Sequence, residues 1–367
     1  MNNLRQVIKA LYIFMTKFLN ILFSKKKVKQ QSIVILMTFP EDMLPIIEGL
    51  NRKGDYQITV IGKDVHRKYT QHLEHVTYVL AGNKQLYRHL KYLSTAKVII
   101  IDTYYLLMGG FLKKEGQTVI QTWHAAGALK NFGLTDHQVD LNNNKMVEQY
   151  RQVYNATDKY IVGGEPMVTC FKESFGATDA QMLRTGLPRL VPYRTVDITQ
   201  RQRELKKQYG IKGKIALYVP TYREHHQANR TIDKHKFETA LPNYTLFSKL
   251  HPSIVNEQHT EINLQSLMIM ADIIISDYSS LAIEASLLNK PTLLYVYDEQ
   301  QYETERGLNT FYYEIPDMYK VYNEGELIQN IKKYESDLQP LFKSWHEYNV
   351  TQSLTKVIET IEEMVKV

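Results

Sequence analysis

Short, almost uninterrupted apolar runs alternate with amphipathic stretches from Ser32 onward, and few folds accommodate this pattern. A strand of a parallel sheet is covered by helices on both faces, so it reads as a continuous apolar run. Strands that alternate with helical stretches form βαβ units. The runs fall into two series, first 32–39, 57–62, 76–80, 97–102, 118–123 and 159–164, and then 214–220, 244–250, 271–277 and 292–298. The sequence therefore predicts an α/β protein with two parallel sheets.

A change of composition separates the two series. Gly186, Pro188 and Pro192 lie close together and are followed by a polar helical stretch at 201–210, which is typical of a connection between domains. We expect two doubly wound domains that face a cleft, with ligand bound at the carboxyl ends of the strands. The expected segments are 1–29, 30–195 and 196–367, the last of which ends in closing helices.

The positive charge of the chain is concentrated at its N-terminus. The sequence has 45 Lys and Arg and 39 Asp and Glu, and seven of the basic residues lie in 1–29, which contain no acid. The remaining 338 residues hold 38 basic and 39 acidic groups. A nucleic-acid-binding body carries basic excess throughout, so nucleic acid is not an expected partner.

The single cysteine, Cys170, is expected to fill the core, and the lack of a possible internal disulfide suits a reducing compartment.

Residues 4–24 predict an amphipathic helix. Lys9 and Lys17 interrupt its apolar run, which is too short to span a membrane, and no small-residue cleavage site follows. At about 100° per residue, the polar side chains fall in a narrow arc beside a wide apolar face. This pattern favours a helix in the interface of an anionic membrane, and docking on the protein's own core is the alternative. The basic residues expected to associate with the membrane are Arg5, Lys9, Lys17, Lys25, Lys26 and Lys27.

A group of polar residues follows the strand expected at 271–277. Ser279 and Ser280 come directly after Asp277, and a helix begins at once. The N–H groups and the dipole at a helix N-terminus favour bound anions, so we expect a phosphate site here. Glu284, one turn further on, can reach a ribose diol. Simple capping of the helix by Asp277 or Ser279 is the alternative.

Other strand ends of the second series add candidate ligands. His251 follows the strand at 244–250, and Pro252 prevents helical continuation there. Arg223 follows the strand at 214–220, where a guanidinium can clamp a diphosphate. Both should lie on the same side of the sheet as Ser279 and Ser280. After the next strand come Asp298, Tyr302 and Arg306.

In the first series, His124 is the main candidate for chemistry. It follows an expected strand in the stretch QTWHAAGALKNFG, and the small residues after it leave room for a ligand. A neutral histidine at this place can accept the proton of an attacking hydroxyl. The alternative is a structural histidine bound to a backbone carbonyl.

Five motifs together resemble the CDP-glycerol glycerophosphotransferase family of Gram-positive teichoic acid synthesis. They are WHAAGALK, PTYR, KLHP, SDYSSLAIE and DEQQYETERG, in that order. The resemblance covers about residues 30–365. It implies a GT-B-like fold of two Rossmann-like domains behind an N-terminal amphipathic helix, with the donor held by the C-terminal half and the acceptor approached from the N-terminal half.

The resemblance also implies roles for individual residues. His124 would be the general base, and His251 would support the donor diphosphate. Ser279, Ser280 and Arg223 would bind phosphate, Glu284 would hold the ribose, and Arg306 would contact the donor, with Asp277, Asp298 and Tyr302 in support. Polymerase members commonly have Gly where this chain has Ala125, a difference that concerns the acceptor pocket.

The implied reaction transfers one glycerol phosphate from CDP-glycerol to an N-acetylmannosamine hydroxyl of an undecaprenyl-diphosphate-linked disaccharide, with release of CMP, at the cytoplasmic face of the membrane. Other teichoic acid enzymes are possible partners. No tightly bound cofactor or metal is expected, because no Asp-x-Asp pair stands at a strand end, and dependence on Mg²⁺ is left open. The alternatives are a glycerol-phosphate or ribitol-phosphate polymerase, a UDP-sugar glycosyltransferase or epimerase, and a non-catalytic membrane-bound scaffold.

Overall fold

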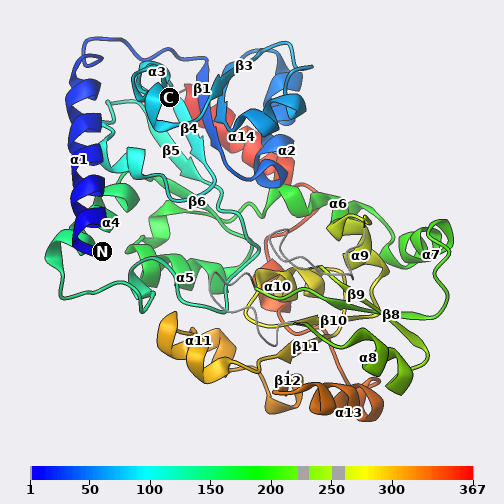
Figure 1. Ribbon diagram of the computed structural model, residues 1–367. Coiled ribbons are helices and arrows are strands. Elements are labelled where there is room, and N and C mark those ends of the chain that lie inside the picture. The colour runs from blue at the N-terminus through cyan, green and yellow to red at the C-terminus, as the bar shows by residue number, and fades with distance from the viewer. Residues whose placement is uncertain (1, 222–230, 250–260, 367) are drawn as a thin grey trace.

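The computed structural model describes residues 2–221, 231–249 and 261–366 (Figure 1). Arg223 and His251, two of the expected site residues, lie outside these ranges. Within them, two sheets form the centre of the molecule, and all their strand pairs are parallel. The first sheet contains β1 (Ser32–Met37), β2 (Gln57–Gly62), β3 (Val76–Leu80), β4 (Val98–Ile101), β5 (Thr118–Gln121), β6 (Lys159–Ile161) and β7 (Met182–Leu183). The second contains β8 (Lys214–Tyr218), β9 (Tyr244–Ser248), β10 (Ile273–Ser276), β11 (Thr292–Tyr295) and β12 (Lys320–Val321).

Both sheets are doubly wound, as the sequence predicts. The first has the order β3-β2-β1-β4-β5-β6-β7, which reverses direction between β1 and β4. The second has the order β12-β11-β10-β8-β9, which reverses between β8 and β10. Ligands of doubly wound sheets bind beyond the carboxyl ends of the strands at such a reversal. These two edges are therefore the places at which to look for a site.

Helices cover both sheets because their apolar faces bury against the strands. They are α2 (Pro40–Lys53), α3 (Leu86–Leu93), α4 (Asn144–Tyr154), α5 (Glu165–Phe175), α6 (Val191–Thr195), α7 (Ile198–Gln208), α8 (Lys234–Ala240), α9 (Leu264–Met270), α10 (Ser280–Leu287), α11 (Glu299–Glu305), α12 (Thr310–Tyr313), α13 (Glu324–Tyr334) and α14 (Ser353–Lys366). Cys170 is buried in α5, within the main core cluster.

The last helix differs from the expected division of the chain. We expected 196–367 to form the second domain, whereas α14 packs on α2 beside the first sheet (Figure 1). A Cβ on Gly49 of α2 would lie 2.9 Å from Cδ1 of Ile358, so the two helices are in close contact. Val357 and Ile361 of α14 are buried. The chain therefore crosses between the sheets a second time after the connection at 184–197.

Helix α1 (Asn2–Ile21) runs along the outside of the first sheet (Figure 1) and docks through part of its polar arc together with Tyr12, Ile13 and Leu19. Ile13 and Thr16 are buried against the 3₁₀ helix Leu106–Gly110, and the buried Asn20 donates to the carbonyl oxygen of Leu112 at 3.4 Å. A Cβ on Gly110 would lie 2.5 Å from the carbonyl oxygen of Ile13, so only glycine permits this approach. The wide apolar face points away from the protein. Its large side chains are 41–68% exposed: Leu4, Val7, Ile8, Leu11, Phe14, Met15, Phe18, Ile21 and the following Leu22.

Nowhere in the described ranges is a helix both long and apolar enough to cross a bilayer.

Candidate active site

A cavity of about 250 Å³ lies between the two sheets, at the carboxyl ends of strands from both. The first sheet contributes the segment after β5, and the second contributes the segments after β8 and β10. The lining residues are Trp123, His124, Ala125, Gly127, Ala128, Lys130, Phe132, Pro220, Thr221, Tyr278, Ser279 and Ser280. The structure thus brings together His124 and the serine pair, which the sequence predicted separately.

The imidazole of His124 is held in one orientation. Its Nδ1 lies 2.9 Å from the backbone carbonyl oxygen of Asp102, and its ring stacks on Phe39 with centroids 4.3 Å apart. A carbonyl can only accept a hydrogen bond, so Nδ1 carries the proton and Nε2 keeps its lone pair. Burial lowers the pKa of His124, against the opposing effect of the Asp102 carbonyl. The ring is therefore neutral near pH 7, as a general base must be.

Asp102 organises the wall behind His124, and the sequence analysis did not single it out. Its carboxylate accepts hydrogen bonds from the N–H groups of Thr38 and Phe39, both at 2.7 Å, and from the hydroxyl of Tyr105 at 2.7 Å. Burial raises the pKa of Asp102 to about 6. These bonds fix the start of α2 and with it the Phe39 ring. The sequence did contain a signal that could have identified Asp102, because this residue stands at the end of the apolar run at 97–102.

Trp123 also escaped the sequence analysis. Its φ is +61°, a conformation that non-glycine residues rarely adopt and that tends to occur at functional sites. The backbone N–H of Trp123 donates to Oε1 of Gln121 at 3.0 Å, which helps to hold this conformation. The indole lies 4.4 Å from the His124 ring between centroids. Backbone strain of this kind has no signature in a single sequence.

The opposite wall is the N-terminus of α10. Oδ1 of Asp277 accepts hydrogen bonds from the N–H and hydroxyl of Thr221, both at 2.7 Å, and so ties the end of β8 to the start of the helix. Ser279 is the N-cap, and its hydroxyl accepts from the N–H of Leu281 at 3.3 Å. Ser280 is the first residue of the helix. The capping alternative thus describes Ser279, and Ser280 is the hydroxyl better placed to meet an anion.

Tyr278 completes this wall, and two expected supporting residues hold it. Its hydroxyl donates to Oδ1 of Asp298 at 3.2 Å, and its ring stacks on Tyr302 with centroids 4.2 Å apart. Asp298 and Tyr302 therefore lie behind the cavity wall.

Glu284 lies away from the cavity. One of its carboxylate oxygens lies 2.8 Å from Nη2 of Arg189, and Nε of Arg189 lies 2.9 Å from Oδ1 of Asp42. This buried group joins α10, the interdomain connection and α2. The structure thus gives Glu284 a partner other than the expected ribose, because Arg189 comes from a segment that spacing along the chain could not place.

Arg306 also differs from its expected role. Its Nη2 lies 2.7 Å from Oδ2 of Asp136, and the Arg306 carbonyl accepts from the N–H of His137 at 3.1 Å. Gly307, with φ of +81°, follows at a point where a Cβ would meet Asn131 and His137. These contacts tie the loop after α11 to the first domain.

The small residues after His124 line the cavity and also allow other side chains to pack closely. Ala125 and Ala128 line the cavity. A Cβ on Gly127, however, would lie 2.3 Å from Cε3 of Trp345. Gly127 therefore lines the cavity and also makes room for the ring of Trp345, which a larger residue would displace.

Two doubly wound domains, with a cavity between the carboxyl ends of their strands, define a GT-B-like fold. The fold is similar to that of the wall teichoic acid polymerase TagF, with a TM-score of 0.74 and 17% identity over 99% of this chain and 98% of that chain. The sequence is 51% identical to the teichoic acid glycerol-phosphate primase of Staphylococcus aureus (strain NCTC 8325 / PS 47), covering 98% of this chain and 99% of the relative. It is 29% identical to the teichoic acid glycerol-phosphate primase of Bacillus subtilis (strain 168), covering 94% and 95%.

The family CDP-Glycerol:Poly(glycerophosphate) glycerophosphotransferase matches residues 45–363. The chain belongs to this family, which confirms the resemblance found in its motifs, and it is a glycerophosphotransferase.

Proposed function

We propose that this glycerophosphotransferase is a primase. It transfers one glycerol phosphate from CDP-glycerol to the N-acetylmannosamine hydroxyl of undecaprenyl-diphosphate-linked N-acetylmannosaminyl-N-acetylglucosamine and releases CMP. The observation that supports it most directly is the pairing of neutral His124 with the N-terminus of α10 in one cavity. The likeness to the S. aureus primase over nearly the whole length of both chains favours primase over polymerase.

The proposed chemistry uses the two walls of the cavity for different tasks. Nε2 of His124 takes the proton of the acceptor hydroxyl as its oxygen attacks the phosphorus that bears glycerol. The bond from that phosphorus to the bridging oxygen breaks, and CMP leaves with the electron pair. The N–H groups of α10 and the Ser280 hydroxyl stabilise the phosphate charge. His251 and Arg223, outside the described ranges, remain proposed ligands of the donor diphosphate.

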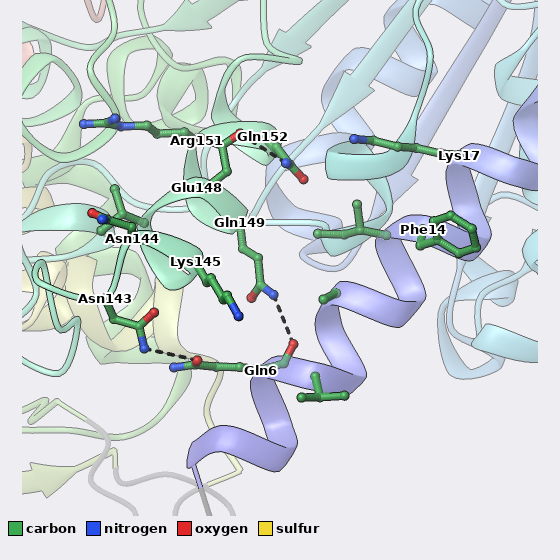
Figure 2. A pocket seen from close by; sticks show the side chains of 14 residues that line it. Gln6, Phe14, Lys17, Asn143, Asn144, Lys145, Glu148, Gln149, Arg151 and Gln152 are labelled. Atoms are coloured by element: carbon green, nitrogen blue, oxygen red, sulfur yellow. Dashed lines mark hydrogen bonds between the residues drawn. The ribbon is translucent and has the colours of Figure 1, made fainter.

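The same proposal places the enzyme peripherally on the cytoplasmic face of the membrane. Arg5 and Lys25–Lys27 are exposed around the outward apolar face of α1. Figure 2 shows how Gln6 fixes this helix to α4: Gln149 donates to its carbonyl at 3.0 Å and Asn143 to its side-chain oxygen at 3.2 Å. A rigidly held helix with an exposed apolar face suits insertion into the headgroup region of an anionic bilayer.

A groove of about 1140 Å³ beside this helix fits the same membrane-facing position (Figure 2). Apolar residues of α1, among them Ala10 and Phe14, line one side. Lys145, Arg151 and Glu148 of α4 line the other, and Lys17 reaches it from α1, so three cations and one carboxylate face the groove. Cationic groups next to an apolar helix face are suited to anionic lipid headgroups.

The test is CMP release from CDP-glycerol with the lipid-linked disaccharide as acceptor. His124→Ala should lower kcat by about 10²–10⁴-fold, while the exposed His72→Ala serves as the matched control and should retain full activity. Mass analysis of the product should find one added glycerol phosphate; long chains would identify a polymerase. Release of UDP from UDP-sugars, with no CMP from CDP-glycerol, would overturn the donor assignment. Parallel assays with EDTA and with Mg²⁺ test the expected independence from a tightly bound metal.

A further inference from the structure

Two further cavities lie in the first domain between the active site and α1, and each shares lining residues with the next. A cavity of about 260 Å³ shares Trp123 with the catalytic cavity. A third cavity, of about 340 Å³, shares Lys9 and Tyr104 with the second. The series thus runs from His124, past Trp123, to a lysine on the helix whose apolar face is exposed.

The second cavity, which we call the aromatic cavity, has a lining suited to sugar rings. Tyr104, Tyr150 and Tyr154 surround it together with Trp123, and the centroids of Tyr104 and Tyr150 lie 5.5 Å apart. A tyrosine combines an apolar ring face with a polar hydroxyl group, and this combination is typical of small-molecule sites. Trp123, in its strained conformation, forms the wall that both this cavity and the catalytic cavity share.

Lys9 is placed at the outer end of this series. Among the described residues that line the aromatic cavity, it is the one charged side chain, and its ammonium lies 5.9 Å from the centroid of the Tyr150 ring. The third cavity adds Lys63 and contains no carboxylate among its described lining residues. The next residue toward the N-terminus, Ile8, belongs to the exposed apolar face of α1. A cation therefore lies where an apolar surface meets an aromatic cavity.

The order of these features matches the chemistry of one occupant. A lipid-linked disaccharide has an apolar chain, then a diphosphate, then two sugars, and its terminal hydroxyl must reach His124. We propose that Lys9 binds the diphosphate of the acceptor and that the aromatic cavity behind Trp123 holds its sugars. This inference rests on the proposed function, because that function supplies the acceptor.

The test uses two acceptors in detergent, so that recruitment to a membrane plays no part. One is a short-chain polyprenyl-diphosphate disaccharide, and the other is an alkyl glycoside of the same disaccharide without diphosphate. Lys9→Met should raise KM for the diphosphate acceptor on the order of tenfold, with kcat and the KM for CDP-glycerol unchanged. It should leave KM for the alkyl glycoside as in wild type. Lys356→Met, an exposed lysine on α14, is the matched control and should alter neither.

Tyr150→Leu tests the aromatic cavity itself. It should raise KM for both acceptors and leave the KM for CDP-glycerol unchanged, because the sugars are common to the two. The site assignment is overturned if Lys9→Met acts equally on both acceptors, if Lys356→Met matches it, or if Tyr150→Leu leaves both KM values unchanged.

A binding measurement separates failure of this inference from failure of the proposed function. The chain has two tryptophans, and Trp345 is only 2% exposed, so added acceptor should change the fluorescence of Trp123. The diphosphate acceptor should give a saturable change in wild type, a weaker affinity in Lys9→Met and no such change in Trp123→Phe. Saturable binding without CMP release would overturn the proposed reaction and leave the site standing. Normal turnover with no effect of Lys9→Met on affinity would overturn the acceptor site and leave the proposed reaction standing.

Discussion

Nδ1 of His124 lies 2.9 Å from the backbone carbonyl oxygen of Asp102, so the end of β4 sets the tautomer of the histidine that follows β5. The same residue uses its carboxylate to hold Thr38 and Phe39, and the Phe39 ring stacks on His124. One strand end therefore controls both the proton and the position of the imidazole. Because the acceptor is a backbone atom, no side-chain substitution at 102 removes it directly.

The pH dependence of activity should follow the lowered pKa of His124. Only the unprotonated ring can act as a base, so kcat/KM falls as the pH drops through the pKa. Burial places this pKa below its ordinary value of 6.5, and the acid limb should therefore lie below pH 6.5. Phe39→Ala admits water to the ring and should move the limb upward toward 6.5. A profile of kcat/KM against pH checks both, and a limb that does not move in Phe39→Ala would contradict the burial argument.

The two serines at the start of α10 should respond differently to substitution. Ser279 caps the helix, so Ser279→Ala should lower the free energy of unfolding by about 1 kcal/mol. Ser280 lies at the first helical position and lines the cavity. Ser280→Ala should raise KM for CDP-glycerol by about tenfold, with little change in stability. Denaturant titration and steady-state kinetics on the two variants distinguish the capping role from the binding role. A larger loss of stability in Ser280→Ala than in Ser279→Ala would contradict this assignment.

The strands could be predicted from the sequence because parallel strands buried on both faces leave continuous apolar runs. Each expected run contains a strand, and β2 and β3 have the expected bounds. The two strands that were missed, β7 and β12, are two residues long and leave no pattern to detect. That His124 and Ser280 line a cavity between the sheets could be anticipated, because both follow shortly after a buried strand.

The contacts between domains could not be predicted in the same way. Arg189 and Asp136 hold Glu284 and Arg306 from distant parts of the chain, and spacing says nothing about such partners. The periodicity of α1 identified its two faces correctly but not which one docks. The polar arc contains small and mid-sized groups, such as Thr16, that fit against Gly110, and this fit depends on a surface formed by other segments.

Removal of the buried Arg189 guanidinium should destabilise the protein strongly. Its guanidinium lies between the carboxylates of Asp42 and Glu284, whose side chains are 10% and 5% exposed. Arg189→Met leaves two buried carboxylates without their cation and should lower the free energy of unfolding by about 3–5 kcal/mol. Lys53→Met breaks the more exposed pair with Glu362 and should cost about 1 kcal/mol or less. Denaturant titration of both variants checks the contrast, and equal losses would show that burial does not govern these pairs.

Membrane association should depend on the exposed apolar face of α1 rather than on the whole segment. Removal of residues 1–29 is a poor test, because Ile13, Thr16 and Phe23 are buried in the protein and their loss would disturb its fold. Leu11→Ser and Phe18→Ser change side chains that are 64% and 60% exposed. Each removes an apolar group worth roughly 1.5–3 kcal/mol when fully buried, so each should weaken partition into anionic vesicles by about tenfold or more.

The matched control for the membrane prediction is Val65→Ser. Val65 is 68% exposed but belongs to the 3₁₀ helix Asp64–Tyr69, in another part of the first domain. Co-sedimentation with vesicles at low and high salt should therefore separate it from the α1 variants, while all retain the wild-type thermal midpoint. Added salt should weaken the binding of wild type, since Lys25–Lys27 lie next to the same face. If Leu11→Ser and Phe18→Ser partition like wild type, this face of α1 does not enter the bilayer.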